Sequence, residues 1–286
     1  MIVEILIILA CVPLFAVNSF CDKYVSSKSK KQSGYLYNTF KFLIGSLLLL
    51  PIMLLDPLPK FSAGAIVCGT ACGILYAVSK TVILKGYAES SVAFMTLCHS
   101  AGMILPCILG HFFWSEPLNA LSIFGILLAV FSIVMLKDTG FDKKDLNLSA
   151  ALIGLTVFIS SGGVMVLQKL MGLYFADESI SAYNFYSFAV AFIIICTFAR
   201  REKEGKSNIR TKLLCAAGSA VSLLVISLVM TSLAGKVPSA ILFPLFNGSG
   251  IISVCVLSAF LFKEKLTKKK SLGLITGIIG LCLVNL

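Results

Sequence analysis

The chain has 286 residues, of which 58% are hydrophobic and 13% are charged. Soluble domains carry about 25% charged residues, so this composition excludes a sizeable water-soluble domain. The net charge is +11, but the lysines and arginines lie between apolar runs, where they indicate membrane topology and contact with anionic lipid rather than nucleic-acid binding.

Apolar runs of the length that a bilayer requires, roughly 20 residues each, follow one another along the whole chain. We expect spans at 2–21, 34–55, 62–84, 90–114, 119–136, 148–172, 179–198, 213–234, 238–262 and 271–286. Backbone groups in hydrocarbon must pair within their own segment, so each span is expected to be a helix. The sequence therefore predicts an all-α, multi-pass protein of ten transmembrane helices in a cell membrane, most simply a bacterial plasma membrane.

The ten cysteines all lie in or beside apolar runs, without a CxxC pair or Cys/His metal spacing. Cysteine in that setting behaves as a small hydrophobe. No phosphate-binding glycine loop occurs either. We therefore expect no disulfide framework, no metal and no cofactor. Gly69 and Gly73 form a GxxxG pair, which favours close helix packing in lipid.

The second half of the chain repeats the first. A shift of 146 positions pairs Lys23 with Lys169, and Tyr37-Asn38 with Tyr183-Asn184. The same shift pairs Phe42 with Phe188, and a shift of 148 pairs Glu116 with Glu264. Because these residue types are rare in so apolar a chain, their order predicts two related halves, 1–137 and 148–286.

Each predicted half contains five spans, so the second half must enter the membrane from the opposite side. Two inverted five-helix repeats are typical of transporters, whose solute site lies near the midplane between the repeats.

These features resemble the drug/metabolite transporter superfamily, in particular its EamA-domain branch. The resemblance covers essentially the whole chain. It rests on Glu116-Pro117-Leu118 after the fourth span, on Glu264-Lys265-Leu266 after the ninth, and on Lys23 and Lys169, which close the first and sixth. The family usually has Gly immediately before these glutamates, whereas this chain has Ser115 and Lys263. The resemblance implies a non-enzymatic exporter, less often an importer, of amino acids, metabolites or toxic organic compounds.

An ionisable residue at membrane depth costs about 2.5–3.5 kcal/mol on insertion scales and is a functional candidate for that reason. His99 lies near the middle of the fourth span, and Asn247 is its repeat partner. A histidine with a pKa near 6.5 could exchange a proton during transport. The alternative is a neutral histidine bonded to a neighbouring helix. We expect both residues to line a central cavity.

Lys80 follows Tyr76 by one helical turn in the third span, so both share a face. The pair could meet an anionic solute, although a lysine that extends to the interface is the simpler interpretation, and Lys41 is interpreted in the same way. Asn18, Asn38 and Asn184 are further candidates for solute binding, with interhelical hydrogen bonding as the alternative. Glu116 and Glu264 are expected to cap helices or to pair with lysines of the links.

The function expected from the sequence alone is transport of a small organic solute by alternating access, with export favoured. The alternatives are a membrane-embedded enzyme and a structural membrane subunit. An enzyme would need a constellation of catalytic residues at a common depth, which the sequence lacks. Nothing in the sequence distinguishes a monomer from a homodimer.

The orientation follows from the basic residues of the links. The odd-numbered links hold 19 Lys and Arg, and the even-numbered links hold 3. Because positive links stay in the cytoplasm, the count predicts odd links inside and both termini outside. Members of the resembling family usually have both termini inside, so the two criteria disagree, and we follow the charge count.

Overall fold

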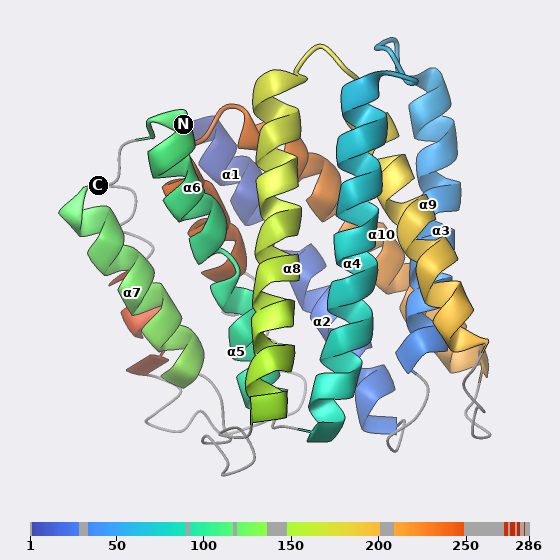
Figure 1. Cartoon of the computed structure of the whole chain (residues 1–286), viewed down its shortest axis with the longest axis horizontal. Coiled ribbons are helices and arrows are strands. Elements are labelled where there is room, and N and C mark those ends of the chain that lie inside the picture. The colour runs from blue at the N-terminus through green and yellow to red at the C-terminus, as the bar shows by residue number, and fades with distance from the viewer. Residues whose placement is uncertain are drawn as a thin grey trace. The chain divides into compact units, whose positions relative to one another are not determined.

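The computed structural model describes residues 2–28, 34–89, 92–116, 119–135, 148–200 and 209–248, and parts of 272–283 (Figure 1). All regular structure in these residues is helical. The helices are α1 (Ile2–Ala10), α2 (Val12–Lys28), α3 (Gly34–Leu55), α4 (Ala63–Glu89), α5 (Val92–Ala101), α6 (Ile104–Trp114), α7 (Ala120–Met135), α8 (Leu148–Tyr174), α9 (Ile180–Ala199) and α10 (Ile209–Ala234). A further short helix covers Ser239–Gly248.

Six of the described helical segments are long and apolar enough to cross a membrane. They are Val3–Asp22, Gly34–Leu55, Ala63–Ile83, Leu148–Tyr174, Ile180–Ala199 and Ile209–Ala234. Cys98–Trp114 and Ser239–Gly248 are shorter apolar helices. The all-helical membrane fold is therefore confirmed, and the full count of ten spans stays a prediction.

Two of the predicted spans are interrupted. The first span breaks at Cys11, whose N–H bonds to the carbonyl of Ile8 (3.0 Å), two residues before Pro13. The fourth span breaks at Gly102 and Met103, between α5 and α6. Pro106 explains the second break, because proline has no N–H to donate to the carbonyl four residues earlier and its ring displaces that carbonyl.

The chain forms two compact units, and each contains corresponding segments of both halves. Unit 2 comprises 13–84 and 167–236, which are the end of the first and sixth spans and the two spans that follow each of them. Unit 1 comprises 1–12, 85–166 and 237–286. Each unit therefore contains segments from both halves of the chain, and neither half forms a unit by itself.

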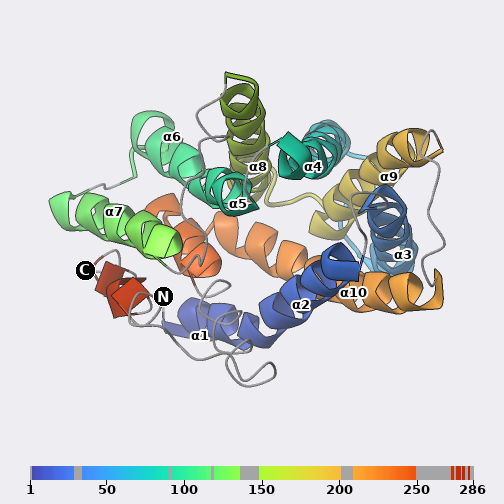
Figure 2. The same cartoon turned by 90° about the horizontal axis from the view of Figure 1, so that it is seen from below.

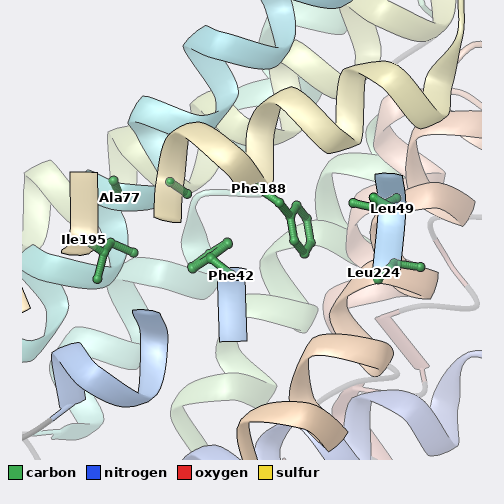
Figure 3. Packing of buried hydrophobic residues seen from close by; sticks show 7 residues of the cluster. Phe42, Leu49, Ala77, Phe188, Ile195 and Leu224 are labelled. Carbon is green, nitrogen blue, oxygen red and sulfur yellow. The ribbon is translucent and has the colours of Figure 1, made fainter. Parts of the chain in front are cut away.

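The core of unit 2 is the contact between α3 and α9, the second span of each half. Phe42 of α3 meets Phe188 of α9 edge to face, with 5.4 Å between ring centroids (Figure 3). Near the ends of the same pair, Tyr35 stacks on Phe198 (6.4 Å). The early residue of one helix thus meets the late residue of the other, so α3 and α9 run antiparallel, as an inverted repeat requires.

The same core repeats its composition under the shift of 146. Leu49 and Ile195 correspond in the two halves, and both are fully buried in the cluster that contains Phe42 and Phe188. A local two-fold axis therefore passes between α3 and α9. Figure 2 shows α10 beside α3, and α10 contributes Leu224 to the cluster.

Glycines allow α4 to approach α9 closely. A Cβ on Gly69 would lie 2.7 Å from the carbonyl oxygen of Tyr183, and one on Gly73 would lie 2.6 Å from that of Ser187. Real Cβ atoms do not reach such distances. The GxxxG pair therefore packs two helices of unit 2 backbone against backbone, as small residues do in membranes.

Carboxylates fix the links at one end of unit 2. Asp56, after α3, accepts hydrogen bonds from the hydroxyls of Ser179 (2.7 Å) and Ser181. Glu178, before α9, accepts from the hydroxyl of Ser62 (2.6 Å) and from the N–H of Ala65 (2.7 Å) in the first turn of α4. Each half therefore stabilises a link of the other.

Unit 1 packs α5, α6 and α7 with the first part of α8 and with the helix Ser239–Gly248. Cys107, Ile126 and Ala240 form its buried cluster. The hydroxyl of Ser132 in α7 donates to the carbonyl of Gly273 (2.6 Å), which joins the fifth and tenth predicted spans.

Candidate functional site

Six polar side chains of unit 2, called here the charged cluster, gather from four helices: Asn18, Asp22, Tyr37, Lys41, Lys80 and Ser219. The ammonium group of Lys41 donates to Asn18 Oδ1 (2.8 Å) and lies 3.3 Å from Asp22 Oδ1. The Tyr37 hydroxyl donates to the same Asp22 oxygen (2.7 Å), and the Ser219 hydroxyl donates to Asn18 Oδ1 (2.5 Å).

Exposure differs sharply within the charged cluster. The side chain of Lys41 is 1% exposed, whereas that of Asp22 is 40% exposed. Lys80 of α4 is half-buried and interacts electrostatically with both Lys41 and Asp22. Because a single charge at membrane depth is expensive, Asp22 is what makes the buried Lys41 tolerable.

A second polar group, called here the neutral cluster, consists of Gln168, Asn184 and Ser227. The Ser227 hydroxyl donates to Asn184 Oδ1 (2.5 Å), and the Gln168 amide donates to Ser227 (3.4 Å). Asn184 also donates to the carbonyl of Ile180 (2.9 Å). The two clusters share one repeat-related position, because the shift of 146 pairs Gln168 with Asp22, whereas it pairs Asn184 with Asn38, outside the charged cluster.

Tyr76 packs against both phenylalanines of the core, which also contact each other. Its ring centroid is 5.8 Å from that of Phe42 and 6.2 Å from that of Phe188. Lys80 is one turn further along α4, so it extends from the same face. Tyr76 and Lys80 therefore share a face of α4, Lys80 interacts electrostatically with Lys41, and Lys41 is bonded to Asn18.

His99 lies in the last turn of α5, directly before the break of the fourth span. Its carbonyl accepts hydrogen bonds from the N–H of Gly102 (3.3 Å) and from the hydroxyl of Ser161 in α8 (2.9 Å). The side chain is half-buried. A broken helix whose freed backbone is bonded by a neighbouring serine is the arrangement found where membrane helices line solute sites.

Asn247, the repeat partner of His99, is half-buried in the helix Ser239–Gly248. Its amide donates to the carbonyl of Phe243 in the same helix (3.0 Å) and lies 4.0 Å from the sulfur of Met165. Both Asn247 and His99 belong to unit 1. Their role as lining of a cavity stays a prediction.

The glutamate after the fourth span is a helix cap. Glu116 Oε2 accepts a hydrogen bond from the N–H of Ser239 (2.7 Å), the first residue of the helix Ser239–Gly248. Ser115, directly before it, has φ 51° and ψ 31°, the only described non-glycine residue in the left-handed region. A glycine would adopt this conformation without strain, which explains the residue that the family usually has here.

The remaining predicted residues are less informative. Asn38 is buried in α3, and Lys169 is buried in α8. Lys23 lies in α2, but its side chain is outside the described part. Leu118, Glu264 and Leu266 lie outside the described residues.

Asp22 and Lys41 were not predicted as site residues. Hydropathy ends the first span at residue 21, which assigns Asp22 to a link, and Lys41 was interpreted as an interfacial lysine. This interpretation of Lys41 is wrong, because its side chain is almost fully buried. The signal that could have found them is helical spacing: Asn18 and Asp22 are four residues apart, as are Tyr37 and Lys41, so each pair shares a helix face.

Comparison with known proteins agrees with this architecture. The sequence model of the EamA-like transporter family matches residues 1–137 and 148–286. One solved structure, whose title reads only "Crystal structure of protein", shares the fold with a TM-score of 0.76. The two sequences are 12% identical, and the match covers 98% of this chain and 95% of the other. No curated protein matches the sequence. With apolar helices that can span a bilayer and a family match in both halves, the chain belongs to the EamA-like transporter family of the drug/metabolite transporter superfamily.

Proposed function

We propose that this transporter exports a small organic solute, such as an amino acid, a metabolite or a drug-like compound, across a bacterial plasma membrane by alternating access. The observation that carries the proposal is the charged cluster. Four helices of unit 2 bring an ion pair, an amide and hydroxyls together. Such groups at membrane depth are costly, and they typically mark the path of a solute.

The position of the charged cluster along the helices supports export. Lys41 is in the second turn of α3, next to the link that carries Lys28, Lys30 and Lys31. The positive-inside rule assigns that link to the cytoplasm. A binding site whose charges lie toward the cytoplasmic end suits a protein that collects its solute inside the cell.

In this proposal His99 and Asn247 line the solute cavity, and His99 takes up and releases a proton during the cycle. The support is the interruption of the fourth span beside His99, together with the ability of imidazole to change charge near neutral pH. A helix that is already broken there can change its geometry with little loss of hydrogen bonding.

Proteoliposomes that contain the purified protein would test the function. We expect at least one solute from a panel of amino acids, nucleosides and lipophilic cations to cross the membrane faster than in empty liposomes. Measurement with and without a proton gradient tests coupling. His99→Ala should abolish transport while the protein remains folded; unchanged transport in this variant would remove His99 from the mechanism, and no transport across the whole panel would count against the function.

A further inference from the structure

We infer that the charged cluster binds the anionic group of the transported solute, with the ammonium group of Lys80 as the contact, so that the substrate is an organic anion. This inference rests on the proposed function and adds the chemical class of the substrate. It is carried by the charges of the cluster, by their exposure and by the neutral residues at the corresponding positions of the second half.

The charges of the cluster do not balance. Asp22 and Lys41 neutralise each other in a pair 3.3 Å long. Lys80 adds a second positive charge that interacts with both of them. The three ionised groups therefore sum to one positive charge, in a region where the membrane makes charge costly. An anion bound at this point would remove the imbalance, and a cation would increase it.

The fold itself does not require these charges. The shift of 146 pairs Asp22 with Gln168 and Lys41 with Ser187, both neutral. The positions 146 and 148 residues after Lys80 are Ile226 and Leu228, both apolar. At these corresponding positions the second half therefore carries neither the ion pair nor the third charge. What distinguishes the charged cluster is therefore chemistry rather than packing.

Exposure assigns different roles to the two lysines. Lys41 is 1% exposed and already donates to Asn18 and Asp22, so it organises the cluster. Lys80 is only half-buried. The side chain of Asp22 is 40% exposed, and Tyr37 and Lys41 both donate to its Oδ1 atom. Lys80 is therefore the cation that a solute can reach.

Four probes that share a phenyl ring and differ in the attached group separate the possibilities. Phenylacetate and phenyl phosphate are anionic, phenylacetamide is neutral, and phenethylamine is cationic. Binding is measured as the rise in unfolding temperature of the full-length protein in detergent, and transport is measured in proteoliposomes. The variants are Lys80→Met, the charge-retaining Lys80→Arg, and the control Lys85→Met, which removes an exposed lysine from the same helix.

We expect the wild-type protein to bind an anionic probe more tightly than the amide and the amine. Lys80→Met should lose affinity for the anions on the order of tenfold, the value of one charge-assisted hydrogen bond, and should keep its weak affinity for the amide. Lys80→Arg and Lys85→Met should both retain anion binding. Whichever anion binds more tightly identifies the head group as carboxylate or phosphate.

Several outcomes would overturn the inference: preference for the amine, equal effects of Lys80→Met on all four probes, or no stabilisation by either anion. The two readouts separate this inference from the proposed function. If cations or amides are transported and Lys80→Met does not affect their transport, the protein is a transporter but its substrate is not an organic anion. If anions bind through Lys80 but no solute is transported, the anion site is supported and the proposed transport function is refuted.

Discussion

The carboxylate of Glu116, at the end of the fourth span, accepts a hydrogen bond of 2.7 Å from the backbone N–H of Ser239 in the second half of the chain. The first four N–H groups of a helix have no partner within it, and negative charge at that end is favourable. The family motif therefore has a structural meaning, since a link of one half caps a helix of the other within unit 1.

Replacement of Glu116 tests this cap. Glu116→Ala should destabilise the protein by about 1 kcal/mol, the usual cost of losing a helix cap. Glu116→Gln keeps an acceptor oxygen and should lose less. Thermal unfolding in detergent measures both, and identical unfolding temperatures for wild type and Glu116→Ala would show that the bond contributes nothing.

Ser115→Gly should stabilise the protein. A left-handed backbone brings Cβ close to the following carbonyl, and glycine avoids this contact. With φ at 51°, we expect a gain of about 1 kcal/mol, reduced by the greater freedom of glycine in the unfolded chain. Ser115→Ala is the matched control and should give no gain. A lower unfolding temperature for the glycine variant would contradict this prediction.

Gly73→Ala should be destabilising, because the new Cβ would lie 2.6 Å from the carbonyl oxygen of Ser187 and α4 would have to move away from α9. Overpacking of this kind costs about 1–3 kcal/mol. Gly218→Ala in α10 is the control: its nearest neighbour is the sulfur of Cys21 at 3.6 Å, which is ordinary contact. Unfolding temperatures that fall equally in both variants would show that α4 and α9 are not in close contact.

Asp56 predicts a dependence of stability on pH. Partial burial alone would raise its pKa, but hydrogen bonds from Ser181 and Ser179 outweigh this and hold the pKa below its usual value. A carboxylate with a lowered pKa contributes stability that is fully present above its unfolded pKa of about 4 and is lost as the pH falls through the folded value. We expect the unfolding temperature of wild type, relative to that of Asp56→Asn, to decrease below about pH 4. A constant difference between the two proteins down to pH 2 would refute the role of these bonds.

The membrane orientation is tested at the C-terminus. The charge count predicts that both termini lie outside the cytoplasm. A reporter that fluoresces only in the cytoplasm, fused after Leu286, should therefore remain dark. The same reporter inserted in the link 199–212 is the control and should fluoresce. Bright fluorescence at Leu286 would mean that the usual orientation of the family holds instead.

The sequence predicted those parts of the fold that depend on local pattern. Residues 34–55 were expected as a helix and are α3, because the run is predominantly apolar and begins after a polar link. Phe42 and Phe188 were paired by the repeat alone. The break at Gly102 was not predicted, although Pro106 stood nearby, because the conformation there also depends on the tertiary bond from Ser161.

The charged cluster could be predicted only in part. Asn18 and Lys80 were candidates because they are polar in apolar runs, and the structure brings both to Lys41. Asp22 was assigned to a link, since hydropathy averages over a window and ignores the partner that makes a carboxylate acceptable in a membrane. That partner, Lys41, lies 19 positions away and on another helix.

The contact of Phe42 with Phe188 bears on the ancestry of the chain. In a symmetric dimer, a residue on the two-fold axis touches its own copy across an isologous interface. These two rings preserve such a self-contact within one polypeptide, as expected for a duplicated protein that once paired with itself in opposite orientations. Fusion of the two copies freed them to diverge away from the axis. One copy could then keep the charged residues Asp22 and Lys41 while the other carries the neutral Gln168 and Ser187. Two identical chains in a dimer cannot differ in this way.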